Sequence, residues 1–262
     1  MTIFRDGLLE GQVALITGGG SGIGFGIASE LARYGARVAI AGRKPKRLES
    51  AVGQLEEQGA RALAVEANVR DPESVRAMVE RTVEEFGRLD VLVNNAAGNF
   101  YAPSADLSQN GWRAVVETDL YGTFFCSQAA YPVMSGQEGG RIISISMTLH
   151  YRGWPQMAHA TAAKAGIDAL TKTLAVEWAP DNITVNAIAP GPIPTEGATK
   201  AFAMGDAGTA AIDEKMRRLI PLGRWGGVDD IGNLVVYLAS PAGAWVTGAI
   251  IVVDGGSSLA RT

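Results

Sequence analysis

Short apolar runs rich in β-branched residues recur along the chain and alternate with longer amphipathic stretches. Apolar runs without in/out alternation predict strands of a parallel sheet that helices cover on both faces. The amphipathic stretches between the runs supply those helices. The seven predicted strands are VALIT at 13–17, ARVAIAG at 36–42, ARALAVEA at 60–67, LDVLVNNA at 89–96, GRIISIS at 140–146, ITVNAIAP at 183–190 and AIIVVDGG at 249–256.

Helix signals and the lack of a linker complete the predicted fold. Asp71 followed by Pro72 predicts an N-cap and first turn, and Gly87 predicts the end of that helix. No Pro/Ser/Gly-rich linker or internal repeat divides the chain, so residues 1–262 are expected to form one α/β domain. The fold class is a single Rossmann-like, doubly wound, parallel seven-stranded sheet. Residues 192–220, rich in glycine and small residues after three prolines, are interpreted as a mobile substrate lid.

Composition narrows the class of ligand. Hydrophobic residues make up 47% of the 262 residues and charged residues 19%, which excludes a disordered chain. With 23 Lys+Arg against 27 Asp+Glu and no basic block, a nucleic-acid partner is not expected and a small molecule is. The lone Cys126 in an apolar stretch predicts a packed thiol in a reducing compartment. Without a recognisable signal, organelle address or membrane span, a cytoplasmic protein with no membrane insertion is expected.

A glycine-rich turn joins the first predicted strand to a helical pattern. Glycines let backbone N–H groups approach a pyrophosphate, and the helix N-terminus adds favourable partial charge. The spacing is T-G-x-x-x-G-x-G rather than G-x-G-x-x-G, so a tight turn without a ligand is the alternative. The predicted cofactor-binding residues of the turn are Gly18, Gly20, Ser21, Gly22, Ile23 and Gly24.

The end of the second predicted strand bears on the choice of cofactor. An NAD site usually places an acid there to hold the ribose hydroxyls, but this chain reads Ala41-Gly42-Arg43-Lys44. A guanidinium binds a 2′-phosphate bidentately, and no carboxylate is present to repel it. We therefore expect NADPH, with Arg43 at its 2′-phosphate. The alternative is that Arg43 and Lys44 merely begin a solvated helix.

Three motifs resemble the short-chain dehydrogenase/reductase family over nearly the whole length: TGGGSGIG at 17–24, NNAAG at 94–98 and PGPI at 190–193. The resemblance implies a cofactor lined by Asn95, Ala96 and Ala97, with Pro190, Gly191 and Ile193 against the nicotinamide. It also implies that Asn68 and Val69 lie beside the adenine, where the family typically has Asp-Val.

The usual chemistry of that family depends on a Tyr-x-x-x-Lys pair, in which the lysine lowers the pKa of the phenol. Lys164 is present, but the tyrosine position is Ala160 and the serine position is Met147. Ordinary ketone reduction is therefore disfavoured. A non-catalytic NADP(H)-binding module is one interpretation of these two losses.

Further motifs carry a narrower resemblance, which favours an enzyme. These motifs are NNAAGNF at 94–100, Thr148-Leu149 followed by Arg152-Gly153, His159-Ala160, LAVEW at 174–178 and PGPI at 190–193. Together they resemble the motifs of peroxisomal-type 2,4-dienoyl-CoA reductases, which lack the tyrosine, with trans-2-enoyl-CoA reductases as near neighbours. The resemblance implies NADPH-dependent reduction of a 2,4-dienoyl-CoA thioester to a 3-enoyl-CoA in unsaturated fatty acid β-oxidation, by a homotetramer.

Asp119 and Lys164 are the candidate catalytic residues. An uncompensated carboxylate inside the apolar helical stretch around Asp119 would be costly, so Asp119 needs a partner or a function. The tyrosine-free reductases have Asp where most of the family has Asn, and a carboxyl group supplies the acid lost with the tyrosine. Pairing with a helix end or with a neighbouring subunit is the alternative for Asp119.

Lys164 lies on a helix predicted from Ala158 to Trp178 and is expected to bind the nicotinamide ribose and to hold Asp119 electrostatically. His150, His159 and Tyr151 are weaker candidates for the proton route. The two histidines have no acidic partners in register and do not form a zinc motif, so no metal is expected.

Four residues are candidates for contact with the CoA thioester. Phe100 is suited to cover an unsaturated acyl chain, although ordinary core packing is the alternative, and Thr148 belongs to the motifs of the narrower resemblance. Arg70 and Lys200 are basic positions that would contact the CoA phosphates, unless they are only solvated. Small residues at Ala165, Gly166 and Ala169 would permit close helix approach between subunits of the expected homotetramer.

Overall fold

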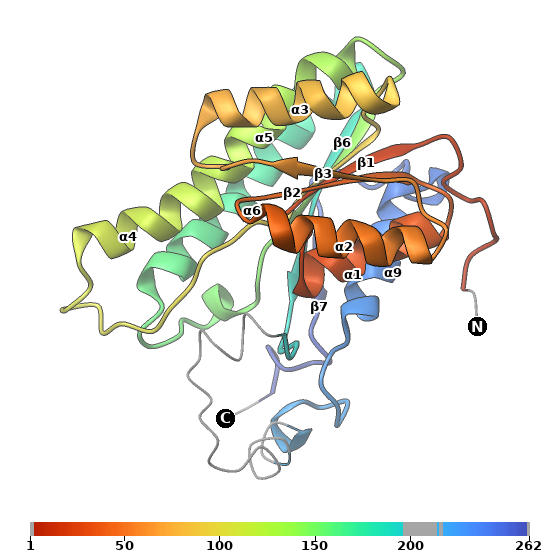
Figure 1. Ribbon diagram of the computed structural model, residues 1–262. Coiled ribbons are helices and arrows are strands. Elements are labelled where there is room, and N and C mark those ends of the chain that lie inside the picture. The colour runs from red at the N-terminus through yellow and green to blue at the C-terminus, as the bar shows by residue number, and fades with distance from the viewer. Residues whose placement is uncertain (1–2, 196–213, 215–216, 261–262) are drawn as a thin grey trace.

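The computed structural model describes residues 3–195, 214 and 217–260. Within them, seven parallel strands form one sheet in the order β3-β2-β1-β4-β5-β6-β7, which confirms the predicted architecture (Figure 1). Every predicted strand is present, and its bounds differ from the expected ones by a few residues at most. The strands are β1 (Val13–Thr17), β2 (Arg37–Gly42), β3 (Ala62–Glu66), β4 (Val91–Asn94), β5 (Gly140–Ile145), β6 (Ile183–Pro190) and β7 (Ile250–Val253).

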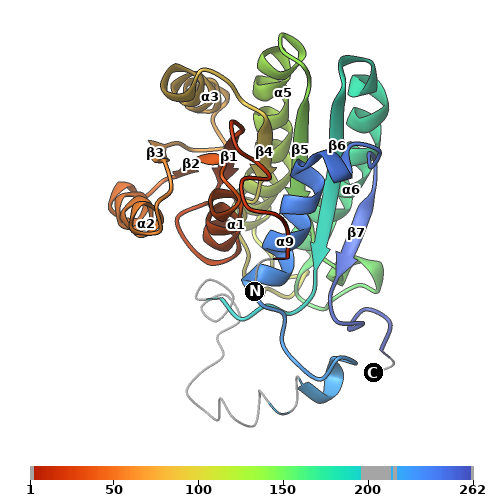
Figure 2. The same ribbon diagram turned by 90° about the vertical axis from the view of Figure 1, so that its right-hand side faces the viewer.

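Helices cover both faces of the sheet, because strands buried on both sides need an apolar layer on each. α1, α2 and α9 pack on one face and α3, α5 and α6 on the other (Figure 2). The helices are α1 (Gly22–Arg33), α2 (Pro45–Glu57), α3 (Pro72–Phe86), α4 (Gln109–Val116), α5 (Gly122–Ser135), α6 (Ala158–Trp178) and α9 (Val228–Ala239), with short turns η1 (Glu117–Tyr121), η2 (Leu149–Tyr151), η3 (Ala179–Asp181) and η4 (Pro241–Gly243).

The predicted boundaries of α3 are confirmed by its capping groups. The Asp71 carboxylate accepts a hydrogen bond from the N–H of Glu73 at 3.0 Å, with Pro72 in the first turn. Gly87 ends the helix with a φ of 80°, a left-handed conformation in which glycine lacks the steric cost of a side chain. Sequence-local chemistry is enough to begin and end this helix.

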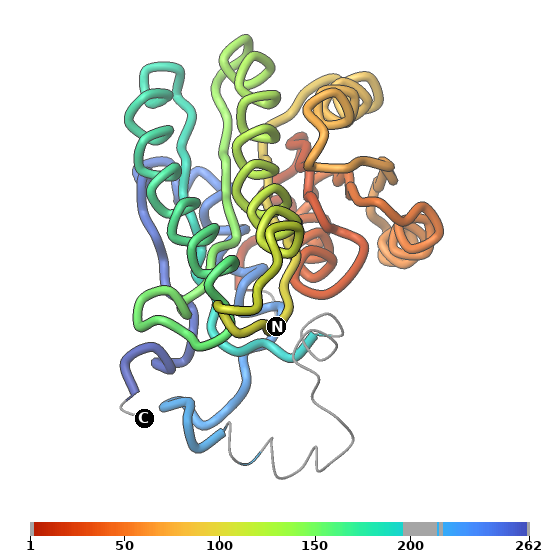
Figure 3. Tube along the Cα trace, turned by 90° about the vertical axis from the view of Figure 1, so that its left-hand side faces the viewer, coloured from red at the N-terminus to blue at the C-terminus, as the bar shows by residue number. Residues whose placement is uncertain are grey.

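α4, η1 and α5 form one uninterrupted run of helix over residues 109–135 that lies alongside α6 (Figure 3). η1 is a single turn of π-helix, which inserts one extra residue into the helical ladder, a feature common at functional sites. Val69 packs where a Cβ on Gly122 would lie, 2.8 Å from its Cγ2 atom. This close approach fixes the end of η1 against the chain that follows β3.

The order of the strands locates the place where a ligand should bind. From β1 the chain adds β2 and β3 on one side, and it then returns to add β4 on the other side of β1. Ligands of such sheets bind beyond the carboxyl ends of the strands, at the point where the strand order reverses. The loops after β1, β2, β4, β5 and β6 all open on this edge. Of the predicted lid at 192–220, residues 196–213 and 215–216 lie outside the described residues, and so does Lys200.

Candidate active site

The turn after β1 has the geometry of a phosphate-binding loop. Gly18 has a φ of 66°, and a Cβ on Gly24 would lie 2.4 Å from Nδ2 of Asn95 and 2.5 Å from the Gly18 carbonyl oxygen. Ser21 precedes α1 with an extended backbone, and its side chain does not cap the helix. The first-turn N–H groups are therefore left for an anion, as the pyrophosphate of a dinucleotide requires.

Asn95 holds this glycine turn against the end of β4. Its Nδ2 donates to the carbonyls of Thr17 at 2.9 Å and Gly18 at 3.3 Å. In return, the Thr17 hydroxyl accepts the backbone N–H groups of Asn95 and Ala96, each at 3.0 Å. The structure thus brings Asn95 and Ala96 beside the turn, with Ala97 exposed at the same edge, and gives Asn95 a structural task that the sequence did not show.

The end of β2 presents basic side chains to solvent. Arg43 and Lys44 are exposed, and Arg43 has no hydrogen bond or ion pair with any described residue. Arg47, in the first turn of α2, donates from Nη1 to the Ser21 hydroxyl at 3.3 Å and so links α2 to the glycine turn. Sequence reasoning missed Arg47, although its position four residues after Arg43 places both near the start of one helix.

The remaining predicted cofactor residues border the same edge. Asn68 is exposed, and its Oδ1 accepts the Arg70 N–H at 3.3 Å, which leaves its side-chain amide group for an adenine. Val69 is buried against Gly122. After β6, Gly191 donates its N–H to the Val253 carbonyl at 2.9 Å, and Pro190 and Ile193 are buried. These residues fit a bound dinucleotide in an extended conformation across the switch point.

Asp119 lies in η1 and is buried with 1% of its surface exposed. Its Oδ1 accepts the N–H of Gly98 at 2.8 Å, and its Oδ2 lies 3.5 Å from Nζ of Lys164. Burial raises the pKa of the Asp119 carboxyl above its ordinary value, although the Lys164 ammonium and the Gly98 N–H favour the ionised form. Burial therefore favours the protonated carboxyl group, the form that can donate a proton, more than in a solvent-exposed aspartate.

Lys164 lies on α6, which spans the predicted range Ala158–Trp178, and 7% of its surface is exposed. Its Nζ donates to the Ile145 carbonyl at 2.7 Å, at the carboxyl end of β5. This bond and the contact with Asp119 hold the ammonium at the sheet edge. The predicted proximity of Lys164 to Asp119 is confirmed, and Lys164 is buried rather than solvated.

An apolar cluster occupies the place of the missing tyrosine and serine. Ala160 is 1% exposed and packs with buried Val115 and Met157, while Phe100, Met147 and Leu149 are partly buried against them. The Phe100 ring also fits over Gly111, where a Cβ would lie 2.9 Å from its Cζ atom. We refer to these six side chains, Val115, Met157, Ala160, Phe100, Met147 and Leu149, as the apolar cluster. Phe100 thus lies at the site. Its two predicted roles, covering an unsaturated acyl chain or ordinary core packing, would use the same apolar contacts.

The expectation that neither histidine has an acidic partner is wrong for His150. Its Nε2 lies 2.8 Å from Oδ2 of Asp168, and the other carboxylate oxygen of Asp168 accepts the Ser146 hydroxyl at 2.6 Å. Asp168 is 18 residues further along the chain and lies within α6, so no local sequence motif predicts its pairing with His150. His159, by contrast, is completely buried at the apolar cluster. Tyr151 lies in η2 with 44% of its surface exposed.

Besides Phe100, two described candidates for contact with the CoA thioester differ in their surroundings. Arg70 forms an ion pair with Glu117 of η1, so its charge already has a partner. Thr148 is buried and donates its hydroxyl to the Pro190 carbonyl at 3.4 Å, which ties the chain after β5 to the end of β6. Arg70 therefore stands beside the turn that carries Asp119, and Thr148 supports the end of β6.

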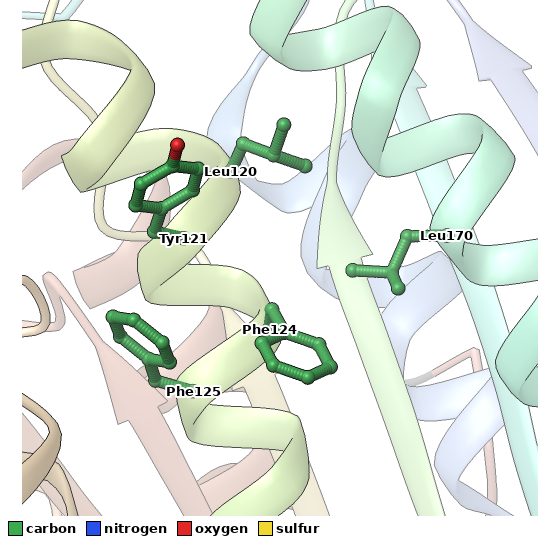
Figure 4. Close-up of a pocket in the computed structure, with 5 residues that line it drawn as sticks. All are labelled: Leu120, Tyr121, Phe124, Phe125 and Leu170. Carbon is green, nitrogen blue, oxygen red and sulfur yellow. The ribbon is translucent and has the colours of Figure 1, made fainter. Parts of the chain in front are cut away.

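A hollow lies away from this edge, between α5 and α6. It is an apolar pocket of about 350 Å³, lined by Leu120, Tyr121, Phe124, Phe125 and Leu170 (Figure 4).

Elsewhere, Cys126 is buried and burial raises the pKa of its thiol to about 12, which agrees with a packed rather than a nucleophilic cysteine. Among the described residues, no cluster of metal-ligating side chains is found. None of the described helices is both long and apolar enough to cross a bilayer.

Comparisons with known proteins agree with this geometry. Residues 18–258 match the family model described as enoyl-(acyl carrier protein) reductase. The chain is 45% identical to a peroxisomal 2,4-dienoyl-CoA reductase, (3E)-enoyl-CoA-producing, from Arabidopsis thaliana, over 98% of this chain and 88% of the relative. It is 39% identical to a probable 2,4-dienoyl-CoA reductase, (2E)-enoyl-CoA-producing, from Bacillus subtilis, over 96% and 98%.

A solved structure supports the same assignment. A short chain dehydrogenase from Bacillus anthracis is 41% identical, with a TM-score of 0.86, over 97% of this chain and 99% of that one. Identity at this level over almost the full length, with a TM-score of 0.86, shows a shared fold. The chain therefore belongs to the short-chain dehydrogenase/reductase family.

Proposed function

We propose that this protein is an NADPH-dependent oxidoreductase that reduces 2,4-dienoyl-CoA thioesters to 3-enoyl-CoA. The observation that carries the proposal is the buried pair of Asp119 and Lys164 beside an apolar cluster that lacks the family's tyrosine and serine. The relatives from Arabidopsis thaliana and Bacillus subtilis, both named as 2,4-dienoyl-CoA reductases, support this substrate class.

The proposed residues divide the work of the reaction. NADPH held by the glycine turn would supply the hydride that C5 of the dienoyl chain receives, and NADP⁺ would be the oxidised product. The apolar cluster, including Phe100, excludes water from the conjugated chain while negative charge spreads to the thioester oxygen. Asp119 delivers the proton to C2, directly or through a water, so that the remaining double bond lies between C3 and C4.

Lys164 serves both halves of the site in this scheme. Its ammonium, fixed by the Ile145 carbonyl, binds the nicotinamide ribose and stabilises the Asp119 carboxylate that remains after proton transfer. Water then reprotonates the carboxylate, and burial favours that step because it raises the pKa of Asp119. The pair can thus return to its starting state after each turnover.

The test of this function is purified protein with NADPH and a panel of CoA thioesters, followed at the nicotinamide absorbance. Rapid oxidation with 2,4-hexadienoyl-CoA and little with trans-2-hexenoyl-CoA would support the proposal, and the reverse preference would indicate a trans-2-enoyl-CoA reductase. Absence of turnover with every unsaturated thioester, despite tight NADPH binding, would indicate the non-catalytic module. NMR of the product distinguishes C3=C4 from C2=C3, the difference that separates the two named relatives.

The choice of NADPH over NADH rests on Arg43. Its exposed guanidinium stands at the end of β2, and Arg47 adds a second cation beside the glycine turn. A 2′-phosphate between them would receive charge-assisted hydrogen bonds. Arg70 and Lys200 remain proposed contacts of the CoA phosphates, and for Arg70 the competing partner is Glu117.

We also propose a homotetramer in the cytoplasm. The apolar pocket between α5 and α6, with Tyr121 and Phe124 exposed beside it, offers a surface for a second copy. Gly166 lets Leu120 of the same chain pack close to α6, since a Cβ on it would lie 2.9 Å from Leu120 Cδ2, and so helps to shape this surface. The sedimentation mass of the native protein tests the assembly, and Phe124→Asp should lower it. The buried, free Cys126 suits a reducing compartment.

A further inference from the structure

His159 is a fully buried imidazole at the edge of the apolar cluster. Its ring packs edge-on against Phe100, with ring centroids 4.5 Å apart and an interplanar angle of 88°. It occupies the second position of α6, next to Ala160, where the family's tyrosine would stand. His159 is therefore close to the place where a reducing enzyme of this family holds its substrate oxygen.

The hydrogen bonds of the ring fix its tautomer. Nδ1 accepts the backbone N–H of Ala160 at 2.9 Å, so Nδ1 carries no proton. Burial lowers the pKa of His159, which keeps the ring neutral, and the single ring proton must then reside on Nε2. Nε2 is buried and makes no hydrogen bond of good geometry with a described residue, although the backbone carbonyls of Met157 and Phe100 act on the ring and partly offset the lowering of its pKa. A buried N–H without a well-placed acceptor is costly and calls for an explanation.

The neighbouring polar groups already have partners. Nζ of Lys164 donates to Ile145, Oδ1 of Asp119 accepts from Gly98, and the Thr148 hydroxyl donates to Pro190. The side chains that replace the ordinary tyrosine and serine, Ala160 and Met147, cannot donate a hydrogen bond. The oxygen of a bound thioester thus lacks the family's usual donors, while one donor at the cluster lacks a well-placed acceptor.

We propose that the Nε2–H group of His159 donates a hydrogen bond to the thioester carbonyl oxygen of the bound acyl-CoA. The inference rests on the proposed function and adds a catalytic residue to it. A fixed N–H in a dry site stabilises the oxygen most when negative charge develops there, after hydride has reached C5. Asp119 then acts on carbon and His159 on oxygen, so the two tasks of the missing tyrosine are divided between two residues.

The test is infrared difference spectroscopy of bound hexanoyl-CoA carrying a ¹³C carbonyl, with NADP⁺ present. Hexanoyl-CoA has no double bond to reduce, so the spectrum reports the hydrogen bond without turnover. The carbonyl band of the unchanged protein should be lowered relative to free ligand, and His159→Leu should remove that shift. His159→Gln, which keeps a donor, should restore part of it.

Kinetics with 2,4-hexadienoyl-CoA give a second readout. His159→Leu should lower kcat by roughly 10²–10³-fold, as for the loss of an oxyanion donor, while the NADPH dissociation constant stays the same. Hexyl-CoA, a thioether without the carbonyl, should bind the variant and the unchanged protein equally. A packing role for His159 alone would instead weaken hexyl-CoA binding and leave the carbonyl band shifted, which would overturn the inference.

The design separates this inference from the function on which it rests. If the unchanged protein does not oxidise NADPH with a dienoyl-CoA, the proposed function fails. If it does, but its own bound carbonyl band is unshifted, only the role of His159 fails, and this measurement needs no variant. If His159→Leu does not fold, His159→Gln and the unchanged protein still decide the question through the band position.

Discussion

The two halves of the site are built in different ways. The cofactor half, the glycine turn between β1 and α1, depends on consecutive residues whose backbone lies at 18–24 and is closed by Asn95. The chemical half joins Gly98, Asp119, Lys164 and the Ile145 carbonyl, which come from four separate segments of the chain. The glycine turn itself is therefore set by local geometry, although Asn95 holds it from another strand, whereas the second half exists only after the sheet has formed.

This difference separates binding from chemistry. The cofactor half carries the helix N-terminus and the exposed cations, features that many functions of the same fold share. In the proposed mechanism, a buried carboxyl group beside an apolar cluster replaces the tyrosine on which the family's usual chemistry depends. A family member can thus keep its cofactor half and change its reaction by substitution at a few positions far apart in sequence.

The largest effect expected from separating the halves is that of Asp119→Asn. Asn is nearly isosteric and can still accept the Gly98 N–H, but it cannot give up a proton, so turnover should fall by roughly 10²–10⁴-fold. NADPH affinity should not change, because Asp119 is not part of the glycine turn. Steady-state rates with 2,4-hexadienoyl-CoA measure the turnover, and fluorescence titration with NADPH measures its affinity. Glu84→Gln, an exposed change on α3, is the control. Near-native turnover of Asp119→Asn would remove the proton route from Asp119.

The sequence predicted more of the fold than of the chemical half. Uniformly apolar runs gave all seven strands, and Asp71 with Gly87 bounded α3, because these signals act within a few residues. The bond between His150 and Asp168 was missed because the partners are 18 residues apart, on η2 and α6. The clamp by Asn95 was missed for the same reason, since Thr17 lies on another strand.

The proposed proton donation by Asp119 could be predicted from the sequence only in part. Its cost in an apolar helical stretch could be argued from the sequence alone, but the π-turn that carries it could not. Nor could the sequence show that His159 has no exposed surface and an Nε2 without a well-placed acceptor. These features depend on how α6 packs against η1 and on the chain after β4, which is tertiary rather than local information.

Arg43→Asp tests the cofactor half without touching the chemistry. Removing a charge-assisted contact with the 2′-phosphate should cost about 1.5–3 kcal/mol of NADPH binding, or roughly 10–150-fold, and NADH should improve. The ratio of kcat/KM values for the two cofactors measures the preference. The dependence of kcat on pH should remain that of the unchanged protein, since Asp119 is intact. Equal use of both cofactors by the unchanged protein would contradict the NADPH proposal.

Gly24→Ala tests the contact between the glycine turn and Asn95. The added Cβ would lie within 2.4 Å of the Asn95 amide and 2.5 Å of the Gly18 carbonyl, so the clamp or the turn must shift. We expect a loss of about 1–3 kcal/mol in the free energy of unfolding, measured by urea titration. Gly53→Ala is the matched control, because Gly53 lies in α2 with nothing within 4 Å of its Cβ position. That control should be neutral or stabilising by up to about 1 kcal/mol, and equal losses in both variants would contradict the clamp.

The smallest expected effect is the dependence of stability on pH that the buried carboxyl group causes. The pKa of Asp119 is raised above its ordinary value of 3.8, so the native state binds this proton more tightly than the unfolded state does. Its contribution to stability is therefore complete below the ordinary pKa and is lost as pH rises through the raised one. Across that window the slope approaches about 1.4 kcal/mol per pH unit.

The difference between Asp119→Asn and the unchanged protein isolates this contribution. Since Asn does not titrate, the stability of the variant relative to the unchanged protein should increase with pH from pH 4 upward and then level off above the raised pKa. Urea unfolding at closely spaced pH values measures the difference, and the exposed Asp106→Asn should show no comparable trend. A difference that shrank with rising pH would mean that Lys164 outweighs burial and keeps Asp119 ionised. The carboxyl group would then be a fixed counter-charge in the native state, and the proton would have to come from water.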